Sequence, residues 1–156
     1  MARTLLIIDM QVGFRLAKNL DLQERIAHEV RLAKKRRAAI VVVEYDGFGK
    51  THDPIHNAIG DYKLQATVHK NRDDGSEEVV VAANKNGFDV KHWRVCGVNI
   101  AYCVNKTVSG LRNLLKDVDI EVKEDACNCN VGKELGRLIV SFLSWNGTEK
   151  ICAKKL

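Results

Sequence analysis

The stretch WRVCGVNIAYCVNKTV (residues 93–108) decides the fold class, because a short strand pattern passes directly into a helical one. Residues 93–98 are mostly apolar and suit a strand buried on both faces of a sheet. From residue 101 to residue 116, apolar side chains recur at three- and four-residue spacings, as along one face of a helix. Such a strand-to-helix step is half of a βαβ unit.

The same alternation continues on both sides of this stretch. Further strands are predicted at residues 5–9, 39–44, 66–70, 118–122 and 150–153. Further helices are predicted at residues 22–37, 77–85 and 131–145. Residues 45–65 are polar, contain the single proline of the sequence and predict a long loop. The alternation predicts one α/β domain over residues 1–156, a three-layer α/β/α Rossmann-like fold with a mostly parallel sheet.

The composition is typical of a globular protein, with 46% hydrophobic and 29% charged residues. The apolar run before Asp9 is too short for the core of a signal peptide. No segment approaches the roughly 18 apolar residues of a membrane span. Five cysteines, an odd number, fit free thiols in a reducing compartment. We therefore expect a cytoplasmic protein without a membrane partner.

The net charge of +5 and the basic run at residues 34–37 raise the question of a nucleic-acid partner. That run falls where a helix is predicted to end, and cations there interact favourably with the helix dipole. The remaining basic residues are scattered among acidic ones. We therefore do not expect nucleic acid as a partner.

Three reactive side chains fall at the same edge of the predicted sheet. Asp9 ends the first strand, Lys70 ends the third, and Cys103 follows the fourth strand at the start of its helix. In parallel sheets ligands bind beyond the carboxyl ends of the strands. We therefore expect these three residues to meet in one catalytic site.

Each of the three has a chemical role available to it. The N–H groups of a helix start stabilise a thiolate, which predicts that the pKa of Cys103 lies below its free value of about 8.5. Asp9 would accept the thiol proton and later return it to a leaving amine, and Lys70 would keep the carboxylate ionised. The alternatives are a helix cysteine that only packs and a structural Asp–Lys ion pair.

Four segments resemble the isochorismatase-like cysteine hydrolases, a family that includes nicotinamidases, N-carbamoylsarcosine amidases and isochorismatases. They are LLIIDMQVGF (5–14), HKNRDDGS (69–76), VCGVNIAYCVNKTV (95–108) and EVKEDAC (121–127), in the family's order. The resemblance implies that Asp9, Lys70 and Cys103 are catalytic. It also implies a cis peptide between Val98 and Asn99 and an oxyanion hole from the backbone N–H groups of Asn99 and Cys103.

The resemblance further implies that Gln11 and Phe14 belong to the substrate-binding region. Tyr45 and Tyr102 are additional candidates for the pocket wall. The implied substrate is a small amide-like molecule, no cofactor is expected, and a homo-oligomer, either a dimer or a tetramer, would suit the family.

The sequence departs from the metal motif of nicotinamidases, Asp-x-His-Pro-x-x-His. Asp46, His52 and His56 occur in that region, but with another spacing, so no metal is expected. Some isochorismatases lack the nucleophilic cysteine. The presence of Cys103 therefore favours cleavage of an amide or carbamoyl C–N bond through a thioester.

Other interpretations remain open or are disfavoured. GFGKT (47–51) resembles part of a P-loop, but Glu44 occupies the position of the first glycine and would repel phosphate. A phosphatase with an aspartyl nucleophile needs a second Asp where Gln11 stands. A catalytically silent binding or assembly module, or an isochorismatase-type vinyl-ether hydrolase, remains as an alternative function.

Overall fold

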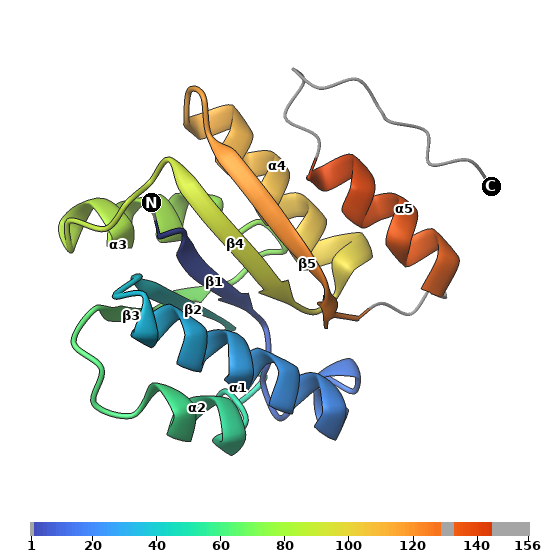
Figure 1. The fold of residues 1–156 in the computed structure, drawn as a ribbon. Helices are drawn as coiled ribbons and strands as arrows, with labels where there is room; N and C mark the ends of the chain where they lie inside the picture. The colour runs from blue at the N-terminus through green and yellow to red at the C-terminus, as the bar shows by residue number, and fades with distance from the viewer. Residues whose placement is uncertain (1, 129–132, 145–156) are drawn as a thin grey trace.

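A computed structural model describes residues 2–128 and 133–144 of the chain. This part contains one parallel sheet with the strand order β3-β2-β1-β4-β5 (Figure 1). The strands are β1 (Thr4–Ile8), β2 (Ile40–Tyr45), β3 (Gln65–Lys70), β4 (His92–Gly97) and β5 (Asp119–Cys127). The predicted α/β class with a parallel sheet is confirmed. Among the described residues, none of the helices combines the length and apolar character that crossing a bilayer requires.

Helices cover both faces of the sheet. They are α1 (Leu20–Lys35), α2 (Asp53–Ile59), α3 (Ser76–Lys85), α4 (Asn105–Leu114) and α5 (Lys133–Leu143), with a 3-10 turn at Leu16–Lys18 and a π-helical turn, η2, at Ile100–Val104. In Figure 1, α1 and α2 lie on one side of the sheet, whereas α3, α4 and α5 lie on the other. The result is the expected three-layer arrangement.

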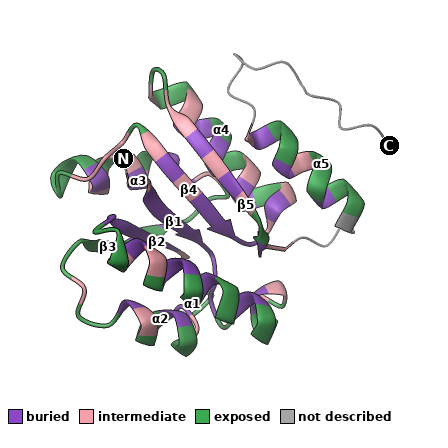
Figure 2. Cartoon of the chain, viewed as in Figure 1, coloured by how far each residue is buried: buried purple, intermediate pink, exposed green. Residues whose placement is uncertain are grey.

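The alternating side chains of β1 build a separate apolar core on each face. Leu5 and Ile7 pack with α1 and α2 in one cluster, and Leu6 and Ile8 pack with α3, α4 and α5 in the other. All five residues of β1 are buried, as Figure 2 shows by their purple colour. A central strand with two buried faces reads as a continuous apolar run, which is why the sequence revealed it.

The long loop predicted at residues 45–65 is partly wrong, because α2 lies within it. Pro54 sits in the first turn of this helix, where the missing N–H costs no hydrogen bond. Ile55 and Ile59 bury one face of α2 against α1. Lys34 donates hydrogen bonds to the carbonyls of Ala58 and Ile59, so one member of the basic run closes the end of α2.

Smaller differences concern the ends of the other elements. The helix predicted at residues 101–116 begins as the π-helical turn η2 and continues as α4, and β5 is longer than expected. Ser76 is the first residue of α3 and makes no side-chain cap. The strand predicted at residues 150–153 lies outside the described residues.

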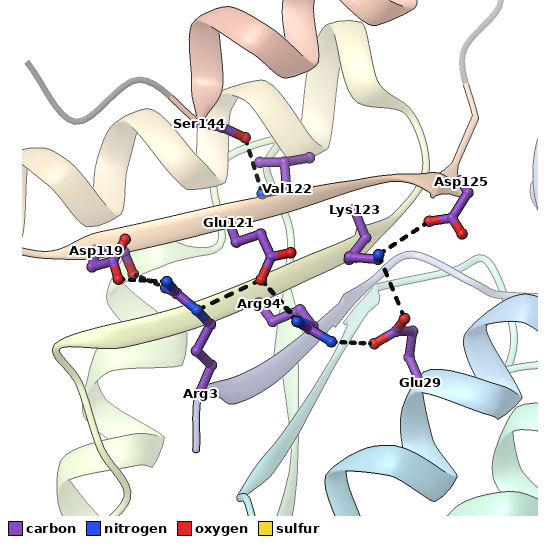
Figure 3. A network of polar contacts seen from close by, with 9 residues as sticks. All are labelled: Arg3, Glu29, Arg94, Asp119, Glu121, Val122, Lys123, Asp125 and Ser144. Atoms are coloured by element: carbon purple, nitrogen blue, oxygen red, sulfur yellow. Dashed lines mark hydrogen bonds and ion pairs between the residues drawn. The ribbon is translucent and has the colours of Figure 1, made fainter. Parts of the chain in front are cut away.

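A network of charged side chains joins α1 to the sheet on the side of β4 and β5 (Figure 3). Glu29 on α1 has a side chain only 8% exposed and lies 3.0 Å from the Arg94 guanidinium. Arg94 also bonds Glu121 at 2.9 Å, and Lys123 lies 3.9 Å from Glu29. Two cations thus face the nearly buried Glu29 side chain and offset the cost of burying a carboxylate there.

Substitution of Arg94 by Met tests this network. It leaves the nearly buried Glu29 carboxylate with only the longer Lys123 contact, so we expect the free energy of unfolding to fall by about 1–3 kcal/mol. Arg3→Met is the control, because Arg3 pairs with Asp119 and Glu121, which are about a third exposed, and should cost less than about 1 kcal/mol. Equal losses in urea unfolding would contradict this account.

Candidate active site

Asp9 is the first residue after β1 and is buried at the carboxyl edge of the sheet. Its backbone has a φ of +54°, and its N–H donates to the carbonyl of Val43 on β2 at 3.0 Å. Non-glycine residues with a left-handed φ are uncommon and often mark functional positions. The neighbouring strand thus holds the backbone that presents this carboxylate.

Lys70, the last residue of β3, pairs with Asp9. The Lys70 Nζ lies 2.9 Å from the Asp9 Oδ2, and both side chains are essentially without solvent exposure. Because β2 separates β3 from β1, the lysine side chain passes the end of β2 to make this contact. Its Nζ lies 5.1 Å from the ring centroid of Tyr45 and donates to the carbonyl of Asp73 at 2.9 Å.

Cys103 lies in the π-helical turn that follows β4, and only 7% of it is exposed. Its thiol donates to the Asp73 Oδ1 at 3.8 Å. The Asp9 carboxylate lies close enough to the thiol to influence its pKa. A π-turn within a helix is rare and frequently occurs at functional sites. The three residues that the sequence predicted to meet therefore do meet, at the carboxyl edge of the sheet.

The expected depression of the Cys103 pKa is wrong. Burial, followed by the hydrogen bond and negative charge of Asp9, raises the pKa of the thiol to about 12, and Lys70 only partly opposes this. Burial also raises the pKa of Asp9, against the opposing charge of Lys70. The effects of desolvation and of a neighbouring carboxylate on the pKa of Cys103 thus outweigh the opposite effect expected from the helix start. In the resting site at neutral pH, the sulfur carries the proton.

The segment between β4 and Cys103 has an unusual backbone. The peptide bond between Val98 and Asn99 is cis, the geometry that the family resemblance implied there. The Asn99 side chain accepts from the N–H of Ala101, and the Asn99 carbonyl accepts from Tyr102 and Val104. These bonds fix the turn that carries Cys103. The assignment of the Asn99 and Cys103 N–H groups to an oxyanion hole stays a prediction.

A cavity of about 640 Å³ opens onto Cys103. The residues that line it are Phe14, Arg15, Leu16, Asp73, Val98, Asn99, Tyr102 and Cys103. Phe14 and Tyr102, two of the four candidates for the pocket wall, are among them. The cavity gives a small molecule access to the sulfur.

The other two candidates, Gln11 and Tyr45, do not line this cavity. Gln11 is completely buried, and its amide bonds the backbone N–H and carbonyl of Tyr45 and the carbonyl of Gly49. Because backbone groups occupy both ends of its amide, Gln11 supports the loops around the site and is not positioned to contact a substrate in the cavity. Tyr45 packs edge-on against Phe14, with ring centroids 6.3 Å apart.

The glycine-rich segment GFGKT (47–51) is part of this support. The carbonyls of Phe48 and Lys50 accept from Gly13 and Val12, and the Glu44 carboxylate accepts from both the N–H and the hydroxyl of Thr51. A Cβ at Gly13 would lie 2.6 Å from the Phe48 carbonyl oxygen, so only glycine fits there. The close contact between these two backbone segments also stacks the ring of Phe48 on that of Phe14, with ring centroids 4.2 Å apart. The segment therefore positions the stacked rings of Phe14 and Phe48 beside the site. This role differs from that of a P-loop, which the sequence also disfavoured.

Sequence reasoning missed three residues at the site. Asp73 and Arg15 line the cavity, and Thr107 is buried behind it. The Thr107 hydroxyl accepts from Gly75 N at 3.1 Å and contacts the Asp73 carbonyl at 3.4 Å, so it ties α4 to the segment after Lys70. The signal for Asp73 was present in the pair of acids before a glycine, but nothing local shows which of the two faces the sulfur.

Of the residues considered for a metal site, His52 and His56 lie one helical turn apart at α2, whereas Asp46 follows β2. His52 precedes α2 as its N-cap, and burial lowers its pKa. Asp46 instead lies 3.9 Å from the ring of His69. Within residues 2–128 and 133–144, no three His, Cys, Asp or Glu side chains are grouped so that they could hold a metal ion.

Comparisons with solved structures identify the fold. The MAR1 ribonuclease of Caenorhabditis elegans superposes with a TM-score of 0.75 at 15% identity, over 91% of this chain and 74% of that one. The nicotinamidase of Staphylococcus aureus gives 0.71 at 15% identity, over 90% and 92%. An isochorismatase of Pseudomonas putida gives 0.73 at 16% identity, over 93% and 84%. No family model and no curated protein matches the sequence. The fold is therefore the isochorismatase-like fold that the resemblance predicted.

The Asp9–Lys70 pair predicts a strong energetic coupling. Lys70→Met leaves a buried carboxylate without its counter-charge, so we expect the free energy of unfolding to fall by about 3–5 kcal/mol. The double variant with Asp9→Asn should lose at least about 1 kcal/mol less than the sum of the two single losses. Lys50→Met is the control, because its contact with Asp53 is exposed and should matter by less than about 0.5 kcal/mol. Additive losses in denaturant unfolding would contradict a coupled pair.

The raised pKa of Cys103 predicts the pH dependence of alkylation. Iodoacetamide should react slowly with Cys103 at neutral pH, and the rate should still be rising without a plateau at about pH 10, because burial and Asp9 raise the pKa of the thiol to about 12. Asp9→Asn removes a charge that raises this pKa, so the profile should move to lower pH. Peptide mapping by mass spectrometry separates Cys103 from the other thiols. A profile that stays in place or moves up in Asp9→Asn would contradict the assignment.

Proposed function

We propose that this chain, which has the isochorismatase-like fold, is a cysteine hydrolase that cleaves the C–N bond of a small amide or carbamoyl compound. The observation that carries the proposal is the contact among Asp9, Lys70 and Cys103 at the end of an open cavity. A carboxylate close to a thiol can act as the base that accepts the proton of the nucleophile. Solved neighbours called nicotinamidase and isochorismatase support a hydrolase over other uses of the fold.

The first half of the reaction forms a thioester. Asp9 accepts the Cys103 proton as the sulfur attacks the carbonyl carbon, and the carbonyl oxygen takes up the electron pair of its π bond. The N–H groups of Asn99 and Cys103 would hold this oxyanion. When the tetrahedral adduct collapses, the C–N bond breaks and Asp9 returns the proton to the departing nitrogen.

The second half restores the enzyme. Asp9 accepts a proton from water, and the resulting hydroxide attacks the thioester carbon. The C–S bond breaks, the sulfur regains its proton from Asp9, and a carboxylic acid leaves. Lys70 keeps Asp9 available as a base throughout, because its ammonium, 2.9 Å away, opposes the rise in the carboxyl pKa that burial causes.

The high pKa of the Cys103 thiol is compatible with these reaction steps. A thiolate is not present beforehand, so the proton moves as the C–S bond forms, when the negative charge passes to the carbonyl oxygen. Catalysis then depends on the oxyanion site as much as on Asp9. The raised pKa of Cys103 also supports the second candidate, a silent binding module. In that case no carbonyl compound reacts with the sulfur, and the thiol stays protonated.

A trapped acyl-enzyme tests the proposal. The protein is incubated with a panel of primary amides and N-carbamoyl compounds, quenched in acid and examined by mass spectrometry. We expect an acyl group on the peptide that contains Cys103, together with released ammonia or amine. Cys103→Ala should lose both, whereas Cys127→Ser, a change at a half-buried thiol away from the cavity, should keep both.

Two outcomes decide between the candidates. Ammonia release that survives in Cys103→Ala would contradict a thioester on this residue, whereas turnover of a vinyl ether by Cys103→Ala, with no amide cleaved, would favour the vinyl-ether alternative. The absence of both adduct and product over the whole panel would support the silent module.

A further inference from the structure

Asp73 combines a fixed backbone with a side chain that faces the sulfur. Its carbonyl accepts hydrogen bonds from Lys70 Nζ and the Thr107 hydroxyl, which hold it from β3 and α4. Its carboxylate lines the cavity and approaches the Cys103 Sγ to 3.8 Å. A substrate whose carbonyl carbon reaches the sulfur must therefore also come close to this carboxylate.

Among residues 2–128 and 133–144, the two cations nearest to Asp73 in sequence pair with other carboxylates. Lys70 gives its ion pair to Asp9, and Arg72 gives its own to Glu77 and Glu78. The adjacent Asp74 is engaged differently, because its carboxylate accepts the backbone N–H of Ser76. Asp73 thus offers its charge to whatever enters the cavity.

Most of the remaining cavity wall carries no charge. Phe14, Leu16, Val98 and Tyr102 present apolar or aromatic surface, and Arg15 is the other charged side chain among the described residues that line the cavity. Of the two charged side chains in this wall, Asp73 is the one that hydrogen-bonds the Cys103 Sγ, at 3.8 Å. Charge recognition next to the reacting carbonyl therefore falls to Asp73.

We propose that Asp73 determines the charge preference of the cavity, so that it favours small amides that carry a cationic group over neutral or anionic amides of the same shape. This inference extends the proposed hydrolase function, and it rests on that function for its premise that the substrate is an amide. A cation bound beside Asp73 would also offset one of the negative charges that oppose ionisation of the sulfur. Such a substrate would help to activate its own nucleophile.

Charged thiol reagents test the preference without requiring catalysis. The probes are 2-aminoethyl, 2-hydroxyethyl and 2-sulfonatoethyl methanethiosulfonate, which are cationic, neutral and anionic. All three react with the same thiolate, so the ratio of their rate constants at Cys103 does not depend on the thiol pKa. We expect the cationic reagent to be the fastest and the anionic reagent the slowest at low ionic strength.

Asp73→Asn should lower the cation-to-anion rate ratio by at least about fivefold, the size expected for one unit charge at this range. Asp73→Glu should keep most of the preference. Asp74→Asn is the matched control, because it removes the same charge one residue away while its amide oxygen can still accept from Ser76. An unchanged ratio in Asp73→Asn, or an equal fall in Asp74→Asn, would overturn the inference. Circular dichroism of each variant confirms folding.

Hydrolysis of small amides of different charge then tests the substrate class. β-Alaninamide is cationic and butyramide is its neutral isostere, whereas succinamate is anionic and somewhat longer. We expect kcat/KM to favour β-alaninamide and this preference to shrink in Asp73→Asn. Hydrolysis of butyramide at equal efficiency by the unmodified protein would overturn the cationic substrate class. Failure to cleave any amide, with the reagent ratio still governed by Asp73, would instead reject the hydrolase proposal alone.

Discussion

The buried ion pair between Lys70 and Asp9 is the contact on which the site depends. Two opposite charges without solvent exposure are tolerated only as a pair with further hydrogen bonds, and here the lysine also bonds the Asp73 carbonyl. The pair spans the end of β2 and so joins β3 to β1 at the edge where the cavity opens. It fixes Asp9, the proposed base, near Cys103, and it holds the segment whose Asp73 side chain contacts the sulfur.

The pair works because the surrounding loops are held by backbone hydrogen bonds. Gln11 uses its amide to join the loop after β1 to the loop after β2, and Gly13 allows the two backbones to come close. Thr107 does the same between α4 and the segment after β3. Side chains on loops can be positioned accurately only when the loops themselves are rigid. Gln11, Gly13 and Thr107 thus hold the loops that surround Asp9, Lys70 and Cys103.

Much of this could be predicted from the sequence, for physical reasons. Buried parallel strands are continuous apolar runs, and their carboxyl ends share an edge, so the meeting of Asp9, Lys70 and Cys103 follows from the topology. Other features depend on contacts that no local pattern contains. The helix α2 is short and its apolar face consists of two isoleucines. The pKa of Cys103 depends on the burial of its turn and on a carboxylate 94 residues away in the sequence, and these outweigh the local helix start. The orientation of Asp73 and the hydrogen bonds of the Gln11 amide to backbone groups also depend on tertiary contacts.

The central claim is that Cys103 attacks a carbonyl group that the turn before it is shaped to receive. A crystal structure of the protein with butyraldehyde tests this directly, because an aldehyde adds to a cysteine thiol and forms a stable analogue of the tetrahedral adduct. The account predicts a covalent bond from Cys103 Sγ to the aldehyde carbon, with the former carbonyl oxygen directed at the N–H groups of Asn99 and Cys103 and Asp9 beside the sulfur. An unmodified Cys103 with the aldehyde bound elsewhere, or an adduct oxygen directed away from those N–H groups, would contradict it.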